Sequence, residues 1–315
     1  MKKIVVTGAL GHIGSRVIRE FPMFFPGVSI YMIDNMLTQR YSSLFNLPGE
    51  GHYKFIEADI LETDLEPIIG GADVVLHLAA ITDAASSVAN RDKVEFNNYN
   101  TTVKVAEACS KTGSPLIHMS STSTYGTQNE IVDEECSEEE LKPQSPYAET
   151  KLKEERFLQR MGCSSGLRFI ICRFGTICGI SPGMRFHTAV NKFCWQAAMC
   201  QPLTVWRTAL YQKRPYLTLD DAIGAYRFII DNKLFDNRVY NILTDNLTVD
   251  QVIRTISKYV SNLSIKYVDT EIMNQLSYEV SGQRFRAKGF RYLGSMEESI
   301  KNTIGLIGRS CSIDD

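Results

Sequence analysis

The sequence lacks several features that would assign it to a specialised class of protein. None of its apolar runs approaches the ~20 residues that a membrane-spanning helix requires. Its eight cysteines include no CxxC pair, and its five histidines show no metal-ligand spacing. The net charge is only −2, so no basic field favours a nucleic acid or an anionic membrane. Cys109, Cys172, Cys194 and Cys200 lie within apolar patterns and are expected to be reduced core residues. We therefore expect a cytoplasmic protein with no metal, nucleic acid or membrane partner.

The remaining composition is that of a globular protein. The chain has 315 residues, of which 44% are apolar and 22% charged, enough for one large domain or two modest ones. The apolar run after Lys2-Lys3 superficially resembles a signal peptide, but Gly8 interrupts it, and a first strand is the better explanation. Further apolar strands alternate with helical patterns, with strands expected over residues 4–6, 28–33, 53–58, 74–78, 116–119, 169–172 and 239–242.

Three glycines follow the first of these strands. Gly8, Gly11 and Gly14 stand where the chain must turn sharply into a helix, which a pattern of Ile13, Val17 and Phe21 predicts. Such a turn lets a pyrophosphate approach the backbone and the helix N-terminus. Asp34 lies 20 residues past Gly14, at the end of the second strand, where a carboxylate binds ribose hydroxyls and disfavours a 2′-phosphate. The pattern predicts a dinucleotide site that prefers NAD to NADP. The alternative is a turn that serves only helix–strand packing.

These signals predict an α/β fold, a doubly wound Rossmann parallel sheet with a smaller, interleaved C-terminal substrate-binding lobe. The regular alternation stops after Phe174 and resumes near residue 215. We therefore assign residues 1–174 and 215–243 to the NAD-binding domain, and residues 175–214 and 244–310 to the lobe.

A possible catalytic pair lies on a helix that we expect to begin at Pro146, with Ser145 as its N-cap. Tyr147 and Lys151 have i, i+4 spacing and project from one face. A lysine ammonium near a phenol lowers the pKa of the phenol and makes it a usable general base. Ser121 follows the fifth strand, where it could bind a reacting oxygen. The pair alone would more simply be a solvated surface contact; after a dinucleotide motif, catalysis is the better explanation.

The combined motifs resemble a known family. Gly8-x-x-Gly11-x-x-Gly14, His77-Leu78-Ala79-Ala80, the Ser/Thr segment 120–126 and Ser145-Pro146-Tyr147-Ala148-Glu149-Thr150-Lys151 are similar to the extended short-chain dehydrogenase/reductases. More narrowly they resemble the NAD-dependent nucleotide-sugar epimerase/dehydratase branch. The resemblance covers roughly residues 3–300.

The resemblance implies a role for particular residues. The catalytic set would be Ser121, Tyr147 and Lys151. The residues that would contact NAD are Gly8, Gly11, His12, Ile13, Gly14, Asp34, Asn35, Asp59, Ile60, Leu78, Ala79, Ala80, Asn98, Tyr147 and Lys151. Those that would contact a nucleotide-diphosphate sugar are Ser121, Thr176, Arg185, Asn191, Trp206 and Arg214, with Arg214 on the diphosphate.

Some positions depart from the pattern of the family. His12 replaces an aromatic residue and is interpreted as a solvent-edge or packing residue rather than a catalyst. Thr176 stands where many relatives carry Asn. Thr122 and Ser123 stand where sugar 4,6-dehydratases carry Asp-Glu, and without that acid pair dehydration is disfavoured.

We expect an NAD-dependent nucleotide-sugar 4-epimerase that works through a transient 4-keto sugar. A nucleotide-sugar 4-dehydrogenase or ketoreductase with net redox is the rival, and epimerisation at another carbon is also open. A non-catalytic NAD-binding regulator is the alternative from a different class. The family resemblance also predicts a homodimer, joined through the helices of about residues 98–111 and 145–160.

Overall fold

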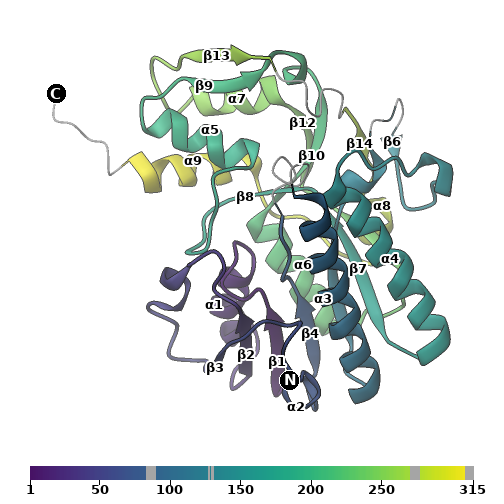
Figure 1. The fold of residues 1–315 in the computed structure, drawn as a ribbon. Coiled ribbons are helices and arrows are strands. Elements are labelled where there is room, and N and C mark those ends of the chain that lie inside the picture. Colours follow the sequence, from purple (N-terminus) through teal and green to yellow (C-terminus); the bar gives the residue numbers. More distant parts are fainter. Residues whose placement is uncertain (83–89, 127, 129–130, 270–276, 309–315) are drawn as a thin grey trace.

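The computed structural model describes residues 1–82, 90–126, 128, 131–269 and 277–308 (Figure 1). Its centre is a seven-stranded sheet in the order β11-β7-β5-β4-β1-β2-β3, in which every neighbouring pair is parallel. All seven strands expected from the sequence are in it, and the predicted doubly wound parallel sheet is confirmed. The strands are β1 (Lys3–Thr7), β2 (Ser29–Asp34), β3 (His52–Glu57), β4 (Val74–His77), β5 (Leu116–Ser121), β7 (Phe169–Phe174) and β11 (Val239–Ile242).

Helices cover both faces of this sheet because successive strand side chains point to opposite sides. Ile4 and Val6 of β1 enter one apolar core, and Val5 enters the other. The first core is closed by α1 (Gly14–Phe24) and α6 (Leu219–Asp231), the second by α2 (Glu66–Ile69), α3 (Arg91–Thr112) and α4 (Pro146–Ser165). Helix α3 begins at Arg91, before the expected start near Asn98.

A second lobe lies beyond the carboxyl ends of the central strands (Figure 1). Its core gathers apolar side chains such as Phe193, Val205, Ile253 and Ile300. The elements that supply this core are α5 (Ala189–Ala198), β9 (Leu203–Trp206), α7 (Val249–Ser257) and α9 (Met296–Gly308), and β13 (Ile265–Val268) pairs with β9. The lobe therefore sits where open α/β sheets place their ligands.

Smaller elements join the two parts. A three-stranded sheet is formed by β8 (Thr176–Cys178), β10 (Lys213–Thr218) and β12 (Asp245–Thr248), and β6 (Ile131–Val132) pairs with β14 (Glu279–Val280). The remaining short elements are α8 (Gln283–Ala287) and 3-10 turns at Tyr41–Leu44, Thr122–Tyr125, Glu138–Glu140 and Arg207–Ala209.

Segments of the two parts alternate along the chain more often than the predicted domain boundaries imply. Strand β10 runs across the boundary at residue 214 and pairs with β8 and β12 rather than with the central sheet. Phe285 and Phe290, assigned to the lobe, pack into the first core of the central sheet. The division into domains stays a prediction, and its last two residues, 309 and 310, lie outside the described residues.

The expected burial was wrong for one cysteine, and of the two interpretations of His12 the packing one is confirmed. Cys200 is exposed rather than part of the core, although Cys109, Cys172 and Cys194 are buried as expected. His12 is not at a solvent edge: it is 5% exposed, and its Nε2 lies 2.9 Å from the carbonyl oxygen of Gly179. It is thus a packing residue that joins the glycine turn to the segment after β8.

Across the described ranges, no helix has both the length and the apolar character needed to cross a membrane.

Candidate active site

The turn between β1 and α1 has the close backbone contacts that its glycines suggest. Gly8 has a φ of +64°, and a Cβ there would lie 2.7 Å from the backbone nitrogen of Ala79. A Cβ on Gly14 would lie 2.5 Å from the carbonyl oxygen of Gly8. A side chain at either position would therefore clash with backbone. The turn brings the N-terminus of α1 against the carboxyl end of β4.

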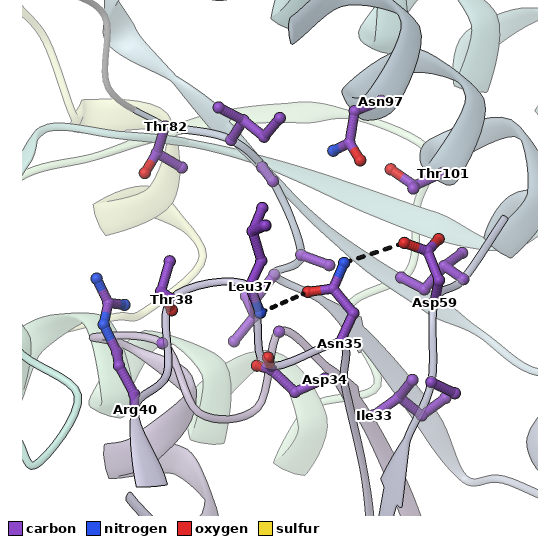
Figure 2. Close-up of a pocket in the computed structure, with 18 of the residues that line it drawn as sticks. Ile33, Asp34, Asn35, Leu37, Thr38, Arg40, Asp59, Thr82, Asn97 and Thr101 are labelled. Carbon is purple, nitrogen blue, oxygen red and sulfur yellow. Dashed lines mark hydrogen bonds between the residues drawn. The ribbon is translucent and has the colours of Figure 1, made fainter. Parts of the chain in front are cut away.

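Polar groups at the end of β2 are held in place by backbone donors. The two carboxylate oxygens of Asp34 accept hydrogen bonds from the backbone N–H groups of Leu10, at 3.1 Å, and Met36, at 3.0 Å. Asn35 donates to Asp59 at 3.0 Å, and its own oxygen accepts from the backbone of Leu37 (Figure 2). These bonds fix the orientation of the side chains that face the cavity described next.

A cavity of about 340 Å³ opens at this end of the sheet. The predicted cofactor residues that line it are Gly8, Gly11, Asp34, Asn35, Asp59, Ile60, Leu78, Ala79 and Ala80. The sequence analysis missed Arg40 and two residues of α3, Asn97 and Thr101, which project toward the cavity in Figure 2. The i, i+4 spacing of Asn97 and Thr101 on one helix was the available signal.

Asn98 has a different place from the one that the family resemblance suggests. It is 1% exposed and lines neither cavity. Its amide nitrogen donates to the carbonyl oxygen of Ile81 at 2.9 Å, and its amide oxygen accepts from the backbone nitrogen of Ile81 at 2.8 Å. Asn98 thus holds the backbone that follows Ala80. His12 and Gly14 also lie outside the two cavities, whereas Ile13 lines the second.

The first cavity fits a dinucleotide. A backbone turn that no side chain could occupy, a helix N-terminus and a fixed carboxylate are the groups that bind pyrophosphate and ribose in such sites. Gly8 and Gly11 of the turn and the Asp34 carboxylate line the same space, and the turn leads directly into the N-terminus of α1.

A second cavity of about 300 Å³ lies between the central sheet and the lobe. It adjoins the first, and both are lined by Thr82, Arg185 and His187. Ser121, at the end of β5, and Tyr147, in the first turn of α4, line it together. As expected, the Ser145 side chain caps α4 by accepting a hydrogen bond from the backbone of Ala148 at 3.2 Å.

Lys151 lies one turn further along α4 and is buried below Tyr147. Its Nζ is 5.9 Å from the centre of the Tyr147 ring and donates to Oε2 of Glu154 at 2.8 Å. Burial disfavours the ammonium, but the charges of Glu154 and Tyr147 outweigh burial and raise the pKa of Lys151. Lys151 therefore carries its positive charge at neutral pH, directly behind the phenol.

Arg214 of β10 also lines the second cavity. Its Nε and Nη2 are buried and have no hydrogen-bond partner among the described residues. Two buried guanidinium nitrogens without partners are costly, whereas an anion in the cavity would accept hydrogen bonds from both. Arg214 is thus the side chain that most directly indicates an anionic ligand.

The other predicted substrate residues divide into two groups. Thr176, Arg185 and Trp206 line the second cavity, and Arg185 contacts the hydroxyl of Thr82. Asn191 does not line it: its side chain accepts from the backbone of Gly179 at 3.2 Å and donates to the carbonyl oxygen of Arg185 at 3.1 Å. Lys192, which the sequence analysis missed, lines the cavity instead.

The described residues that line the second cavity include three cations and no carboxylate. The cations are Arg185, Lys192 and Arg214. The described part of the chain also contains no group of three or more side chains that could hold a metal ion. This distribution of charge suits an anionic ligand.

Comparisons with known proteins agree with this geometry. The model of the NAD dependent epimerase/dehydratase family matches residues 4–242. A trifunctional UDP-glucose 4,6-dehydratase/UDP-4-keto-6-deoxy-D-glucose 3,5-epimerase/UDP-4-keto-L-rhamnose-reductase of Arabidopsis thaliana is 30% identical over 96% of this chain and 46% of its own length. The chain thus spans about half the length of that relative. An uncharacterized UDP-glucose epimerase of Bacillus subtilis is 31% identical over 76% of each chain.

Solved structures share the fold. A UDP-glucuronic acid 4-epimerase from Bacillus cereus, in complex with UDP-glucuronic acid and NAD, is 24% identical and has a TM-score of 0.89, covering 98% of this chain and 99% of its own. A UDP-N-acetylglucosamine 4-epimerase from Methanobrevibacter ruminantium M1, also 24% identical, has a TM-score of 0.87 with the same coverage.

Proposed function

Because the chain belongs to the NAD-dependent epimerase/dehydratase family, we propose that it is an enzyme that inverts C4 of a nucleotide-diphosphate sugar. One observation carries the proposal. Ser121 and Tyr147 share a cavity with Arg214, and that cavity adjoins the one that fits a dinucleotide. A phenol, a hydroxyl and a guanidinium thus line one space next to the proposed cofactor site, and we assign them the roles of base, hydrogen-bond donor and anion-binding cation.

NAD is the cofactor of this family, and when bound it supplies the acceptor and donor of a hydride. The glycine turn would hold its pyrophosphate, Asp34 and Asn35 its adenosine ribose, and Asp59 with Ile60 its adenine. Leu78, Ala79 and Ala80 would contact its centre. Asp34 favours NAD over NADP because a 2′-phosphate would bring a second negative charge beside its carboxylate.

The residues of the second cavity can perform the proton transfer. Tyr147 would take the proton of the sugar 4-hydroxyl, and Ser121 would hydrogen-bond to the same oxygen. The positive charge of Lys151, 5.9 Å from the centre of the Tyr147 ring, would stabilise the phenolate through which Tyr147 acts as a base. Arg214 would hold the diphosphate and with it the position of the sugar. Tyr147 would then return the proton to the oxygen of the inverted centre.

The side chains that line the second cavity support epimerisation over dehydration. Removal of the C5 proton and loss of water from C6 need an acid and a base beside those carbons. Thr122 and Ser123 stand at the positions where the family's dehydratases carry an acid pair, and no described lining residue is Asp or Glu. This chain belongs to the same family as the dehydratases among its relatives. We propose that it does not catalyse the dehydration that they catalyse.

The proposal is tested with sugar nucleotides deuterated at C4. We expect a C4-inverted product that keeps its deuterium, with no lasting rise in NADH absorbance. A 4-keto product with stoichiometric NADH would support the rival dehydrogenase. The Tyr147→Phe variant is the control: it should still bind NAD while turnover falls about 10²–10⁴-fold, and turnover near the wild-type level would remove Tyr147 from the mechanism.

A further inference from the structure

A buried polar cluster lies behind the catalytic helix, away from both cavities. Its centre is Glu154 of α4, whose side chain is fully buried. Oε2 of Glu154 accepts from Lys151 at 2.8 Å and lies 3.0 Å from Nε2 of His118 on β5. The other carboxylate oxygen, Oε1, has no hydrogen-bond partner among the described residues. An ionised carboxylate this deep in the protein is costly unless it is paired, and Lys151 is the cation that pairs with it.

The charge states of the residues in this cluster follow from their burial and their partners. Burial opposes ionisation of Glu154, but Lys151 and His118 outweigh it and lower the pKa of Glu154 to about 2. Burial lowers the pKa of His118, so this imidazole is neutral at neutral pH. At neutral pH, Lys151 and Glu154 therefore form an ion pair directly behind Tyr147.

The groups that face Glu154 come from several elements. The ring of His77 on β4 stacks on His118, with 5.8 Å between the centres, and its pKa too is lowered by burial. Helix α3, which packs along α4, presents Thr102 to His77 and pairs Glu95 and Arg91 with exposed residues of α4. The charged and titratable groups around Glu154 are thus Tyr147, Lys151, Glu155, His118, His77 and Arg173.

Glu155, the next residue, is just as buried but has other partners. Arg173 on β7 donates to both of its oxygens, at 3.0 Å and 2.6 Å, and Ser120 donates to it as well. Glu155 therefore serves a closed structural pair. The two neighbouring carboxylates differ in one respect that matters here: only Glu154 binds Lys151.

We propose that Glu154 is a positioning residue that fixes the Lys151 ammonium and partly offsets its field on the Tyr147 phenol. The inference rests on the proposed role of Tyr147 as base. Lys151 alone would favour the phenolate strongly. The negative charge of Glu154 acts in the opposite direction, and the balance sets the pH at which Tyr147 loses its proton.

The size of the effect follows from the distances. Nζ of Lys151 is 5.9 Å from the Tyr147 ring centre and 2.8 Å from Oε2 of Glu154, which places the carboxylate within about 9 Å of the phenol ring. At that separation and an effective dielectric near 20, removal of one charge should move the ionisation of Tyr147 by about one pH unit. Loss of a negative charge favours the phenolate, so the shift is downward.

The test is an ultraviolet titration of phenolate in the NAD-bound protein. Each variant is compared with its own Tyr147→Phe counterpart, and the difference isolates Tyr147 from the other tyrosines of the chain. Glu154→Gln should lower the ionisation midpoint of Tyr147 by about one pH unit. The matched control, Glu155→Gln, should move the midpoint by less, because Glu155 does not contact Lys151, while lowering the melting temperature.

A second variant covers the case in which Glu154→Gln does not fold. The double variant His118→Leu/Glu154→Met replaces both polar groups by apolar ones of similar size, so that no imidazole is left facing the place of the lost carboxylate. It should show the same downward shift. An unchanged midpoint in the Glu154 variants, an upward shift, or equal shifts in the Glu154 and Glu155 variants would overturn the inference. Because the titration needs no substrate, these results are independent of whether the enzyme is a 4-epimerase.

Discussion

Replacement of Arg214 by alanine probes the proposed diphosphate site most directly. Its Nε and Nη2 are buried without a partner among the described residues, so the free protein gains little from this charge. A charge-assisted hydrogen bond to phosphate contributes roughly 1.5–3 kcal/mol. Its loss should therefore weaken binding about 10- to 150-fold. Binding of NAD, in the adjoining cavity, should be unchanged.

The assay is calorimetric titration of the NAD-bound protein with UDP and dTDP, which serve as probes of the diphosphate site. Lys213→Ala is the matched control. Lys213 precedes Arg214 on β10, and successive strand residues point to opposite faces. Its ammonium pairs with Glu279 at the surface, at 2.8 Å. This variant should bind both nucleotides as the wild type does.

Thermal unfolding separates the ligand role from a structural one. A buried cation without a partner does not stabilise the fold, so Arg214→Ala should melt no more than slightly below the wild type. The Arg214→Met variant, which keeps the apolar part of the side chain, should melt at the wild-type temperature or above it. A folded Arg214→Ala protein with unchanged nucleotide affinity would refute the reasoning, as would a large loss of stability in both variants.

Three further predictions follow from the fold and the cofactor site. Gly8→Ala should abolish NAD binding and should lower the melting temperature by more than Gly27→Ala does. Both positions have positive φ, but of the two only Gly8 has backbone atoms within 3 Å of a new Cβ. Equal losses in melting temperature and unchanged NAD affinity would contradict this prediction. Titration of the cofactor-free protein should show tighter binding of NAD than of NADP, and Asp34→Asn should narrow the difference; tighter NADP binding in the wild type would refute the role of Asp34. Sedimentation at micromolar concentration should show a homodimer joined through α3 and α4. Phe96 is an exposed apolar residue of α3, and the Phe96→Glu variant should be a monomer. A monomeric wild type would contradict the predicted interface.

The sequence by itself determined the parts of this protein that depend on local order. The cofactor motif is one continuous segment that contains a strand, a glycine turn, a helix and a second strand ending in Asp34. Its geometry therefore depends on residues that are neighbours in the sequence. The same is true of Tyr147 and Lys151, which one helix places on one face, and of Ser145, which caps that helix. The parallel sheet followed because strands and helices alternate along the chain.

Helix phase and long-range contacts were decided only by the tertiary structure. Asn191 and Lys192 are neighbours in the sequence, but successive residues of a helix point about 100° apart. One therefore holds backbone inside the lobe, and the other lines the cavity. Asn98, with Asn97 beside it on α3, shows the same division.

The partners of the buried charges depend on how distant segments pack. Nothing near Glu154 in the sequence shows that it is fully buried, or that His118 of β5 lies against it while Arg173 of β7 takes Glu155 instead. The unpartnered state of Arg214 is likewise a property of the cavity around it. Sequence order fixes which groups a helix or turn presents, whereas the packing of helix on sheet and of lobe on sheet decides which charges meet and which remain available for a ligand.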